Sequence, residues 1–258
     1  MSSKIIKFVA AGDSHGDMAD WDSSIPALLE FCKDFKPDQR ICLGDAFDFR
    51  ALREKAGDTE RNESLDDDVD QGLEFLSKYK PQVWLWGNHE HRLERMLTST
   101  GSALERDRCI DIKDKLISKS KLCGVKKILP YHSELGIYEL GRIAFAHGYA
   151  HGRDAVLKQG AHYAERGGGF VCGHIHRLES VALEKWQGGA AYSAGCLCRK
   201  DLMAYAAQRL GTARWGNGFL AGWTNIHTGD WKCWLIHKVG PSDNWWWQTD
   251  IKFFNPNK

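Results

Sequence analysis

Six short, almost continuous apolar runs are the feature of this sequence that most constrains its fold. Each run ends in a polar or glycine-rich turn, and the runs cover residues 5–13, 40–45, 82–89, 142–148, 169–174 and 190–195. A run of this kind is typical of a β-strand that is buried on both faces. Between the first three runs, apolar residues recur at helical spacing over 24–35 and again over 67–79. Strands and helices in alternation predict βαβ units and a layered α/β fold.

Side chains that commonly bind metals follow five of these runs, at the point where each predicted strand ends. The five blocks are GDSHG (12–16), GDAFD (44–48), GNHE (87–90), AHG (146–148) and GHIH (173–176). Because ligands of open α/β sheets bind outside the carboxyl ends of the strands, we expect these side chains to lie along one edge. Carboxylate and imidazole together suit Mn, Fe, Zn or similar divalent ions, whereas the absence of thiolates argues against a structural zinc site.

Each block taken alone is weak support for a metal site. An isolated Asp-x-His is usually a turn with a surface histidine, Gly-Asn-His can be a tight turn, and a lone His147 is more often packed than ligating. The pair His174 and His176 is stronger, because two residues at i and i+2 of a strand end can both lean toward one site. Five such blocks in order, each after an apolar run, are hard to explain by chance, and together they predict a metal centre.

With these five blocks, the sequence resembles the calcineurin-like metallophosphoesterase superfamily from residue 5 to about 200. Its motifs look closest to those of phosphodiesterases and DNA-repair exonucleases within the superfamily. The resemblance implies a four-layer α/β/β/α sandwich with a dinuclear metal centre at one sheet edge.

The resemblance also implies which residues hold the two ions. The first metal would be bound by Asp13, His15, Asp45 and His176. The second would be bound by Asp45, Asn88, His147 and His174, so that Asp45 bridges both. Mn²⁺ is the first expectation, with Fe, Zn and Ni as alternatives, because all of them accept this set of ligands.

Further residues near the blocks are candidates for roles beyond metal binding. By resemblance, His89 is not a ligand but faces the leaving group, as a catalytic residue. Asp48 is expected to orient an imidazole, with His89 as the candidate, or else to cap the turn after the second strand. Three arginines follow motif blocks and are candidates for binding a substrate phosphate, although each could equally be a solvent-exposed side chain: Arg50, Arg92 and Arg177.

This set of residues suits phosphoester hydrolysis. Two divalent ions ~3.5–4 Å apart can hold a bridging water, lower its pKa and clamp the attacking and leaving oxygens. We therefore expect in-line attack of a metal-bridging hydroxide on phosphorus. His89 would stabilise the phosphorane oxygens or protonate the leaving alkoxide.

The remaining segments fit one metallophosphoesterase domain over 1–258. Residues 91–135 interrupt the strand–helix rhythm, and we expect a mainly helical insertion over one end of the sheet. The acidic segment 63–70 is most simply a solvated loop with the first turn of a helix. Two apolar runs around 228–230 predict a C-terminal hairpin, and a tail with three consecutive tryptophans follows within 218–258. These tryptophans could close the core or meet a partner subunit.

Composition excludes several classes of protein. The 35 Lys plus Arg nearly cancel the 34 Asp plus Glu, which rules out a strongly basic nucleic-acid coat protein but permits a local basic groove. No apolar run approaches the ~18 residues of a membrane span. The N-terminal apolar stretch meets Asp13 too soon for a signal peptide. We therefore expect no membrane partner.

The eight cysteines are scattered, without a C-x-x-C pair, and several lie in apolar runs. Buried free thiols in a reducing cytoplasm explain them better than a disulfide framework does, so a cytoplasmic location is expected. Cys196 and Cys198 resemble half of a metal site, but without a partner pair they are interpreted as core thiols.

The motifs bear less on the substrate than on the reaction. GDAFD and Gly-His-Ile-His-Arg look closer to phosphodiesterases, whereas GNHE followed by Arg92 looks closer to phosphoprotein phosphatases. Those phosphatases carry arginine where this chain has Phe49, and they typically lack the second histidine, here His176. A phosphodiester of a nucleotide or nucleic acid is therefore the first expectation for the substrate.

Nucleic-acid binding has a candidate surface in the lysine-rich segment 106–127 together with the tryptophans. Against this, Trp84 and Trp86 lie inside a predicted strand, where tryptophan usually packs. Two alternatives stay open. The first is a phosphomonoesterase acting on a phosphoprotein or a small nucleotide, and the second is a non-catalytic binding scaffold. The intact set of expected ligands speaks against the scaffold.

Overall fold

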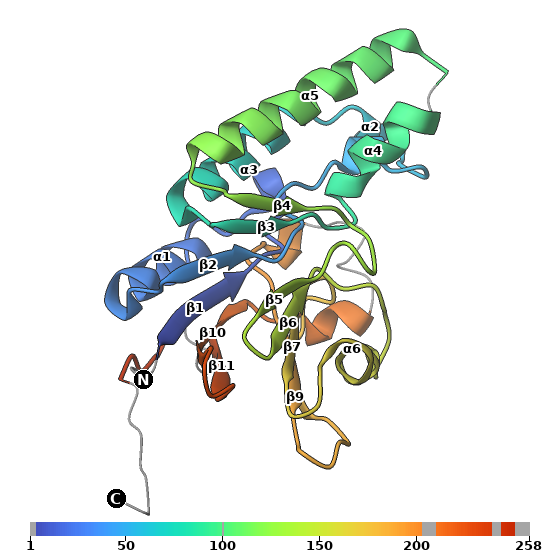
Figure 1. Ribbon diagram of the computed structural model, residues 1–258. Coiled ribbons are helices and arrows are strands. Elements are labelled where there is room, and N and C mark those ends of the chain that lie inside the picture. Colours follow the sequence, from blue (N-terminus) through green and yellow to red (C-terminus); the bar gives the residue numbers. More distant parts are fainter. Residues whose placement is uncertain (1–3, 100, 203–209, 239–243, 251–258) are drawn as a thin grey trace, which may run out of the picture.

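Two β-sheets packed face to face lie at the centre of this computed structural model, which describes residues 4–99, 101–202, 210–238 and 244–250 (Figure 1). The strands of the first sheet are, in spatial order, β11 (Trp231–His237), β10 (Gly218–Asn225), β1 (Ile5–Ala11), β2 (Gln39–Cys42), β3 (Val83–Leu85) and β4 (Lys127–Leu129). Those of the second sheet are β5 (Tyr138–Leu140), β6 (Ile143–Ala146), β7 (Gly169–Cys172), β9 (Ala190–Ala194) and β8 (Leu178–Ala182). Pairing is parallel from β1 to β4 and from β6 through β7 to β9.

Helices cover the outer faces of both sheets. The main ones are α1 (Ser24–Phe35), α3 (Leu65–Tyr79), α4 (Glu90–Ser99), α5 (Ala103–Leu122) and α6 (Ala155–Tyr163). Short helices lie in the connecting loops: η1 (Gly16–Met18), η2 (Arg50–Leu52), α2 (Asp58–Arg61), η3 (Lys200–Leu202) and η4 (Leu210–Arg214). The first four main helices share an apolar core with the first sheet, and α6 shares one with the second. With a third core between the sheets, the chain has the expected α/β/β/α layers.

The apolar runs are explained by these layers. Along β1, Phe8 and Ala10 face the core between the sheets, whereas Val9 and Ala11 face the core beneath the helices. Successive strand residues point to opposite faces, so a strand covered on both sides needs apolar residues at every position. Phe8 meets Phe145 of the second sheet edge to face, with ring centroids 5.2 Å apart. All six apolar runs form strands, as predicted.

The insertion at 91–135 is mainly helical but not entirely so. Residues Lys127–Leu129 form β4, which extends the first sheet beyond β3. Helix α5 buries Cys109, Ile112 and Leu116 at helical spacing against α3 and α4. The expectation of helices over one end of the sheet therefore missed an edge strand, which is only three residues long and lies in a lysine-rich stretch.

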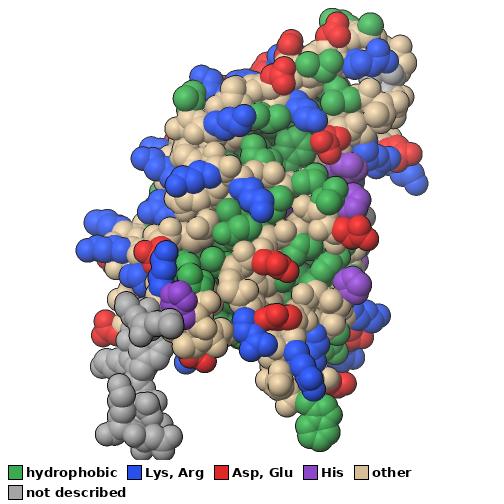
Figure 2. Space-filling model, in the orientation of Figure 1, with side chains coloured by type: hydrophobic (Ala, Val, Ile, Leu, Met, Phe, Trp, Pro, Cys, Tyr) green, Lys and Arg blue, Asp and Glu red, His purple; other side chains and the backbone are tan. Residues whose placement is uncertain are grey.

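The acidic and basic segments of the chain face each other. Arg108 and Lys115 of α5 pair with Asp66 and Asp70 of α3, and Lys113 pairs with Glu94. These three pairs involve three of the eight Lys and Arg side chains of the basic segment 106–127. In Figure 2, acidic side chains accompany basic ones near the top of this face, whereas Lys and Arg stand without acidic neighbours along its left part. This pairing does not favour the nucleic-acid groove expected from 106–127.

One acidic residue of 63–70 corrects the interpretation of that segment as solvated. Asp68 is only 3% exposed and lies within α3, under the loop that follows β2. Its neighbours in the first turn of the helix are exposed, as expected. The sequence pattern alone does not distinguish the buried carboxylate from the exposed ones.

The C-terminal hairpin forms as expected, with Gly229 in the turn at φ 76°. Its first strand, β10, is buried on both faces rather than alternating, because Phe219 and Ala221 face the core beneath the helices and Leu220 faces the core between the sheets. Of the predicted segment 218–258, residues 239–243 and 251–258 lie outside the described part.

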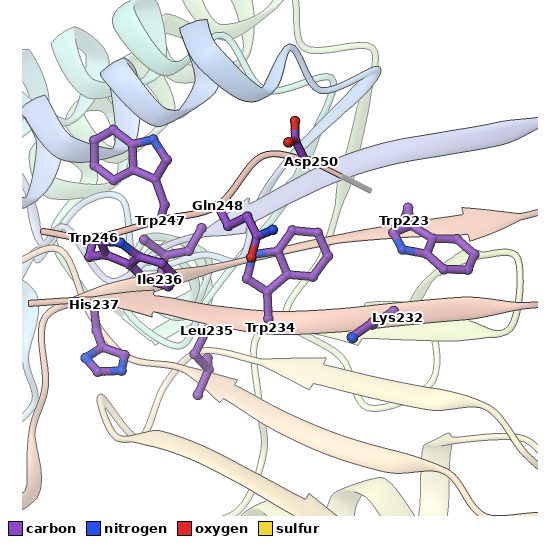
Figure 3. Close-up of a pocket in the computed structure, with 10 residues that line it drawn as sticks. All are labelled: Trp223, Lys232, Trp234, Leu235, Ile236, His237, Trp246, Trp247, Gln248 and Asp250. Carbon is purple, nitrogen blue, oxygen red and sulfur yellow. The ribbon is translucent and has the colours of Figure 1, made fainter. Parts of the chain in front are cut away.

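Two of the three tail tryptophans pack onto the first sheet and α1. Trp245 stacks on Phe219, and Trp247 meets Phe31 edge to face. Trp246 is 69% exposed. A hollow of about 570 Å³ is lined by four indoles, those of Trp223, Trp234, Trp246 and Trp247 (Figure 3). This hollow contains none of the expected metal ligands, and the tail tryptophans mainly close the core.

All eight cysteines are free, and seven of them are buried, in agreement with the interpretation as core thiols. Among the helices of the described residues, none combines the length and apolarity that crossing a bilayer requires.

The hydroxyl of Tyr79 ties α3 to the first sheet, because it donates to the carbonyl oxygens of Val9 and Ile41 at 2.9 and 3.2 Å. We expect Tyr79→Phe to lower the free energy of unfolding by about 1–2 kcal/mol, since it leaves buried carbonyl oxygens without this donor. Urea unfolding measures the change. Tyr138→Phe is the control, because the half-buried Tyr138 hydroxyl makes no hydrogen bond within the described residues. Equal losses in the two variants would contradict the role given to the Tyr79 hydroxyl.

Candidate metal centre

The five blocks lie at the carboxyl ends of parallel strands from both sheets. Asp13 and His15 follow β1, Asp45 follows β2, and Asn88 follows β3. The second sheet contributes His147 after β6, and His174 and His176 after β7. The loops are joined directly, since the amide of Asp13 donates to Gly44 and the amide of Gly173 donates to His147. The fold therefore brings all seven expected ligands to one edge of the two sheets.

Four of these residues form a first group. His176 Nε2 lies 3.1 Å from Asp13 Oδ1 and 3.0 Å from His15 Nε2. His15 Nε2 lies 4.0 Å from Asp45 Oδ2. This is the set expected for the first metal. Cys198, interpreted from sequence as a core thiol, places its sulfur beside His15 and His176.

A second group forms around His147. Its Nε2 lies 3.0 Å from Asn88 Oδ1, 3.3 Å from Asp45 Oδ2 and 3.2 Å from His174 Nδ1. This is the set expected for the second metal. Asp45 belongs to both groups, and its carboxylate is 2% exposed between them.

The hydrogen bonds of His15 and His147 show which ring nitrogen of each is directed toward the centre. His15 Nδ1 lies 3.0 Å from Asp48 Oδ2, and His147 Nδ1 lies 2.8 Å from the carbonyl oxygen of Leu43. A carboxylate and a carbonyl only accept, so each imidazole donates through Nδ1, and in its neutral form, the form that binds a metal, it has its lone pair on Nε2. Both lone pairs face carboxylate or amide oxygens, an arrangement that calls for positive charge at that point. The residues thus fit two divalent cations held by oxygen and imidazole ligands.

The pKa values indicate the same need for a cation. Burial works to lower the pKa of His147, but the charge of Asp45 outweighs it and raises that pKa to about 9. Burial would raise the pKa of Asp45, yet His147 and His89 hold it well below its usual range. Burial and the charge of His147 lower the pKa of His174 to about 2, so that this imidazole is neutral and available as a ligand.

Backbone strain is concentrated in the ligand loops. Five of the seven expected ligands have left-handed backbone conformations, with φ between 46° and 70°: Asp13, His15, Asp45, His174 and His176. Such conformations cost free energy for any residue with a Cβ atom, and Asp and His tolerate them better than most. The sheets and helices around the loops must therefore hold these side chains in place.

Two motif glycines are required by close approach to the ligands. A Cβ atom at Gly87 would lie 2.0 Å from Asp45 Oδ1, and one at Gly173 would lie 2.3 Å from Asp13 Oδ2. Any side chain at either position would displace a carboxylate of the centre. The glycines of GNHE and GHIH are thus explained by the ligands of neighbouring loops.

Asp48 and His89 are in contact, though not as the sequence suggested. The Asp48 carboxylate accepts from His15, and its backbone oxygen lies 2.7 Å from His89 Nδ1. The other nitrogen of His89, Nε2, lies 3.7 Å from Asp45 Oδ2 and 3.1 Å from Arg92 Nη2. Asp48 therefore orients one imidazole with its side chain and a second with its backbone. His89 and Arg92 meet beside the shared carboxylate.

The other two candidate arginines differ in their surroundings. The guanidinium of Arg50 is held by Asp17 and Glu63 and is largely buried, so that its donors are already engaged. Arg177 pairs with Glu179 and donates to the carbonyl of Gly152, yet it lines the cleft above the ligands. Of the three arginines, Arg92 and Arg177 lie where a substrate phosphate could reach them.

Sequence reasoning missed two buried carboxylates that hold the loop after β2. Glu90 accepts from the amides of Asp45, Ala46 and Gly87. Burial, assisted by the charge of Asp45, raises the pKa of Glu90 to about 7. Glu90 is the last residue of the GNHE block, and that position was the only signal for it.

The second missed carboxylate is Asp68. It accepts from the amides of Asp48 and Phe49, and burial raises its pKa to about 7. Sequence offers no signal for this residue, because only the tertiary packing of α3 under the loop separates it from its acidic neighbours.

A third missed residue is His151, whose Nε2 lies 3.2 Å from His174 Nε2. Its signal is the repeat of Ala-His-Gly at 150–152, which follows the block at 146–148 after one residue, Tyr149. His151 is exposed and lines the cleft described next.

An open cleft of about 420 Å³ lies over the ligands, and we name it the central cleft. It is lined by Asp45, Asn88, His89, His151, Gly152, Arg153, His174, Ile175, His176, Arg177, Thr212, Arg214 and Trp215. In Figure 2, the histidines visible on this face of the molecule gather mainly along the edge between α4 and α6. A solvent-borne ligand could thus reach both groups directly.

The chain was compared with protein families, curated sequences and solved structures. A family model described as calcineurin-like phosphoesterase matches residues 6–186. No curated protein sequence matches the chain. Among solved structures, the chain is similar to the crystal structure of a Vps29 single mutant from Entamoeba histolytica, at 12% sequence identity and a TM-score of 0.33, over 91% of this chain and 100% of that chain.

Because Asp45 belongs to both ligand groups, its substitution should change how many metal ions the protein holds. We expect the wild type to hold two Mn²⁺ per chain after equilibration and dialysis, as measured by elemental mass spectrometry. Asp45→Ala should hold less than one, because its carboxylate belongs to both groups. His162→Ala, which removes an exposed imidazole on α6, is the control and should keep two. Two ions retained by Asp45→Ala would show that this carboxylate is not shared.

The bond from His15 to Asp48 gives a second expectation. Asp48→Ala should weaken Mn²⁺ binding about 10–100-fold, because the partner that fixes the tautomer of a ligating histidine is lost. Asp48→Asn keeps an acceptor oxygen and should lose less. Calorimetric titration of the metal-free protein measures both affinities, with Asp114→Ala, an exposed carboxylate on α5, as the control. Unchanged affinity in Asp48→Ala would show that the Asp48 carboxylate does not support metal binding through His15.

Proposed function

Because the chain belongs to the calcineurin-like phosphoesterase family, we propose that it is a dinuclear metal-dependent hydrolase that cleaves a phosphodiester of a nucleotide or nucleic acid. The observation that carries the proposal is the Asp45 carboxylate, which lies between two groups of imidazole and oxygen ligands at the floor of an open cleft. A scaffold that only binds a partner would have no need for this arrangement.

We assign the first ion to Asp13, His15, Asp45 and His176, and the second to Asp45, Asn88, His147 and His174. Mn²⁺ is the ion we propose, since the set consists of hard oxygen and imidazole ligands. When bound, two such ions activate a water for in-line attack and offset the charge of the phosphate oxygens. Neutral Asn88 contributes a ligand without adding negative charge, so that the site still attracts an anionic phosphate.

His89 is the catalytic residue we propose on the side of the leaving group. Burial works to lower the pKa of His89, but the charges of Asp45 and Asp48 outweigh it and raise the pKa above its usual value. The raised pKa favours the protonated imidazole, which can deliver a proton from Nε2 to a departing alkoxide once Arg92, the present donor to that nitrogen, turns to a substrate phosphate. Arg92 reaches the same nitrogen, so a phosphate placed there would contact both side chains.

A diester is preferred over a monoester as the substrate for two reasons. Phe49, at the place where phosphoprotein phosphatases carry arginine, is fully buried and stacked on Phe47, so it offers nothing to a phosphate. His176 completes the first group of ligands. A phosphomonoesterase is the second candidate, favoured by the contact of Arg92 with His89. For location we propose the cytoplasm, where the free thiols would remain reduced.

The test compares Mn²⁺-dependent hydrolysis of an aryl phosphodiester and of its monoester. We expect the diester to be the better substrate by kcat/KM. A preference for the monoester of more than about tenfold, or ~1.4 kcal/mol of barrier, would reverse the order of the two candidates. No hydrolysis of either ester by protein that holds its metal would refute the proposed hydrolase.

His89→Ala tests the assignment of the general acid. We expect kcat to fall about 10²–10⁴-fold with the Mn²⁺ content unchanged, because the imidazole serves the leaving group and binds no ion. His132→Ala, on an exposed loop, is the control and should retain full activity. If His89→Ala lost metal together with activity, His89 would be a ligand instead.

A further inference from the structure

A second cleft meets the central cleft at the candidate metal centre. This lateral cleft has a volume of about 620 Å³, and its lining includes Asn88, Arg53, Lys55, Arg92, Arg95 and Tyr131. Asn88, an expected metal ligand, lines both clefts. Open space therefore extends from the centre in two directions, over the β6 and β7 loops and along α4.

Cations outnumber carboxylates on the lining of the lateral cleft, which has three arginines and a lysine but one carboxylate, Glu54. Arg53 and Arg92 also pair with acids outside the lining, Glu60 and Asp48. Glu54 pairs with Arg95 at 3.0 Å, but both side chains are more than half exposed, and such a pair contributes little and exchanges readily. Lys55 forms no ion pair with any residue that the structure describes.

The central cleft is also positive. Arg153, Arg177 and Arg214 line it, and its carboxylate is Asp45, which belongs to the metal centre. Within the described ranges, neither Arg153 nor Arg214 makes an ion pair, and both are exposed. On α5, the cations Arg108, Lys113 and Lys115 pair with acids of α3 and α4. For a chain with a net charge of only +1, these two clefts are a local concentration of cations that favours an extended polyanion.

The volumes of the two clefts and the aromatic side chains that line them suit nucleotides. Volumes of about 420 and 620 Å³ lie in the range of ~300–1,000 Å³ typical of small-molecule sites, so each cleft has room for a nucleotide-sized group. An aromatic ring lines each cleft: Trp215 in the central one and Tyr131 in the lateral one. Aromatic side chains are the usual stacking partners of unpaired bases. A phosphate monoester would need only one of these clefts.

From these observations we infer that the substrate is a single-stranded oligonucleotide that crosses the metal centre, with nucleotides in both the central and the lateral cleft. The scissile phosphate lies over the two ligand groups, and the flanking phosphates meet Arg153 and Arg214 on one side and Lys55 and Arg95 on the other. The inference deepens the proposed function and rests on it for the cleaved bond. Occupation of the clefts is a matter of binding and can be measured without catalysis.

The experiment measures binding of a fluorescent single-stranded DNA 12-mer by anisotropy, with a chelator present so that nothing is cleaved. Lys55→Glu/Arg95→Glu tests the lateral cleft, and Arg153→Glu/Arg214→Glu tests the central cleft. Each double variant should weaken binding at least tenfold. In each, the plot of log affinity against log salt should become shallower, with the magnitude of its negative slope smaller by about 1.4. This is the change expected for two lost contacts to single-strand phosphates. The Gln variants at the same positions remove the positive charge without reversing it, and they should weaken binding by a smaller factor than the Glu variants.

Lys121→Glu/Lys126→Glu is the matched control, because it makes the same change of charge at exposed lysines that line neither cleft. It should bind within twofold of the wild type. Equal losses in the control and the cleft variants would overturn the inference, since binding would then follow overall charge alone. A loss confined to one cleft, or duplex DNA binding as tightly as the single strand, would also overturn it.

Activity separates this inference from the proposed function. If the Mn²⁺-loaded protein hydrolyses an aryl diester but the 12-mer does not bind, the inference is wrong and the proposed function stands. If the 12-mer binds through both clefts while no ester is cleaved, the proposed hydrolase is wrong and the binding site stands. Where both hold, the cleft variants should lose at least tenfold more kcat/KM on the 12-mer than on the aryl diester.

Discussion

The Asp45 carboxylate is the constraint on which the rest of the site depends. It lies between two histidine groups whose lone pairs are directed toward it by Asp48 and by the backbone of Leu43. Such a carboxylate must be held closely, because a displacement would break both groups at once. Glu90 accepts from the amide of Asp45 itself, and Asp68 holds the next residues of the loop. The two buried carboxylates are thus part of the centre without being ligands.

The layered fold supplies the stability that these loops lack. Most of the expected ligands have left-handed backbone conformations, which neighbouring residues must stabilise. The strands before them are buried in two apolar cores each, one between the sheets and one beneath the helices. The C-terminal strand β10 pairs with β1 and covers its free edge. The rigid sheets therefore fix where the loops begin, and the strain is confined to the few residues that ligate.

Charge is distributed in a way that the near-zero net charge conceals. Two of the four lysines of α5, Lys113 and Lys115, pair with acids of α4 and α3 and so tie these helices together. Lys55, Arg153 and Arg214, which form no ion pair within the described residues, lie in the two clefts that meet at Asn88. The position of these charges matters more than their number, since attraction of an anionic substrate depends on the local electrostatic potential and not on the net charge.

The sequence by itself determined the strands and the ligands. A strand covered on both faces must be apolar at every position, and the carboxyl ends of parallel strands must lie together, so the runs and the blocks after them predicted an α/β fold with one metal centre. Tertiary structure alone decided the rest. Asp68 differs from its acidic neighbours only by lying under a loop, β4 is an edge strand because β3 leaves an edge to pair with, and Asp48 turns its carboxylate to His15. Burial and partners depend on segments distant in the chain, which local patterns do not contain.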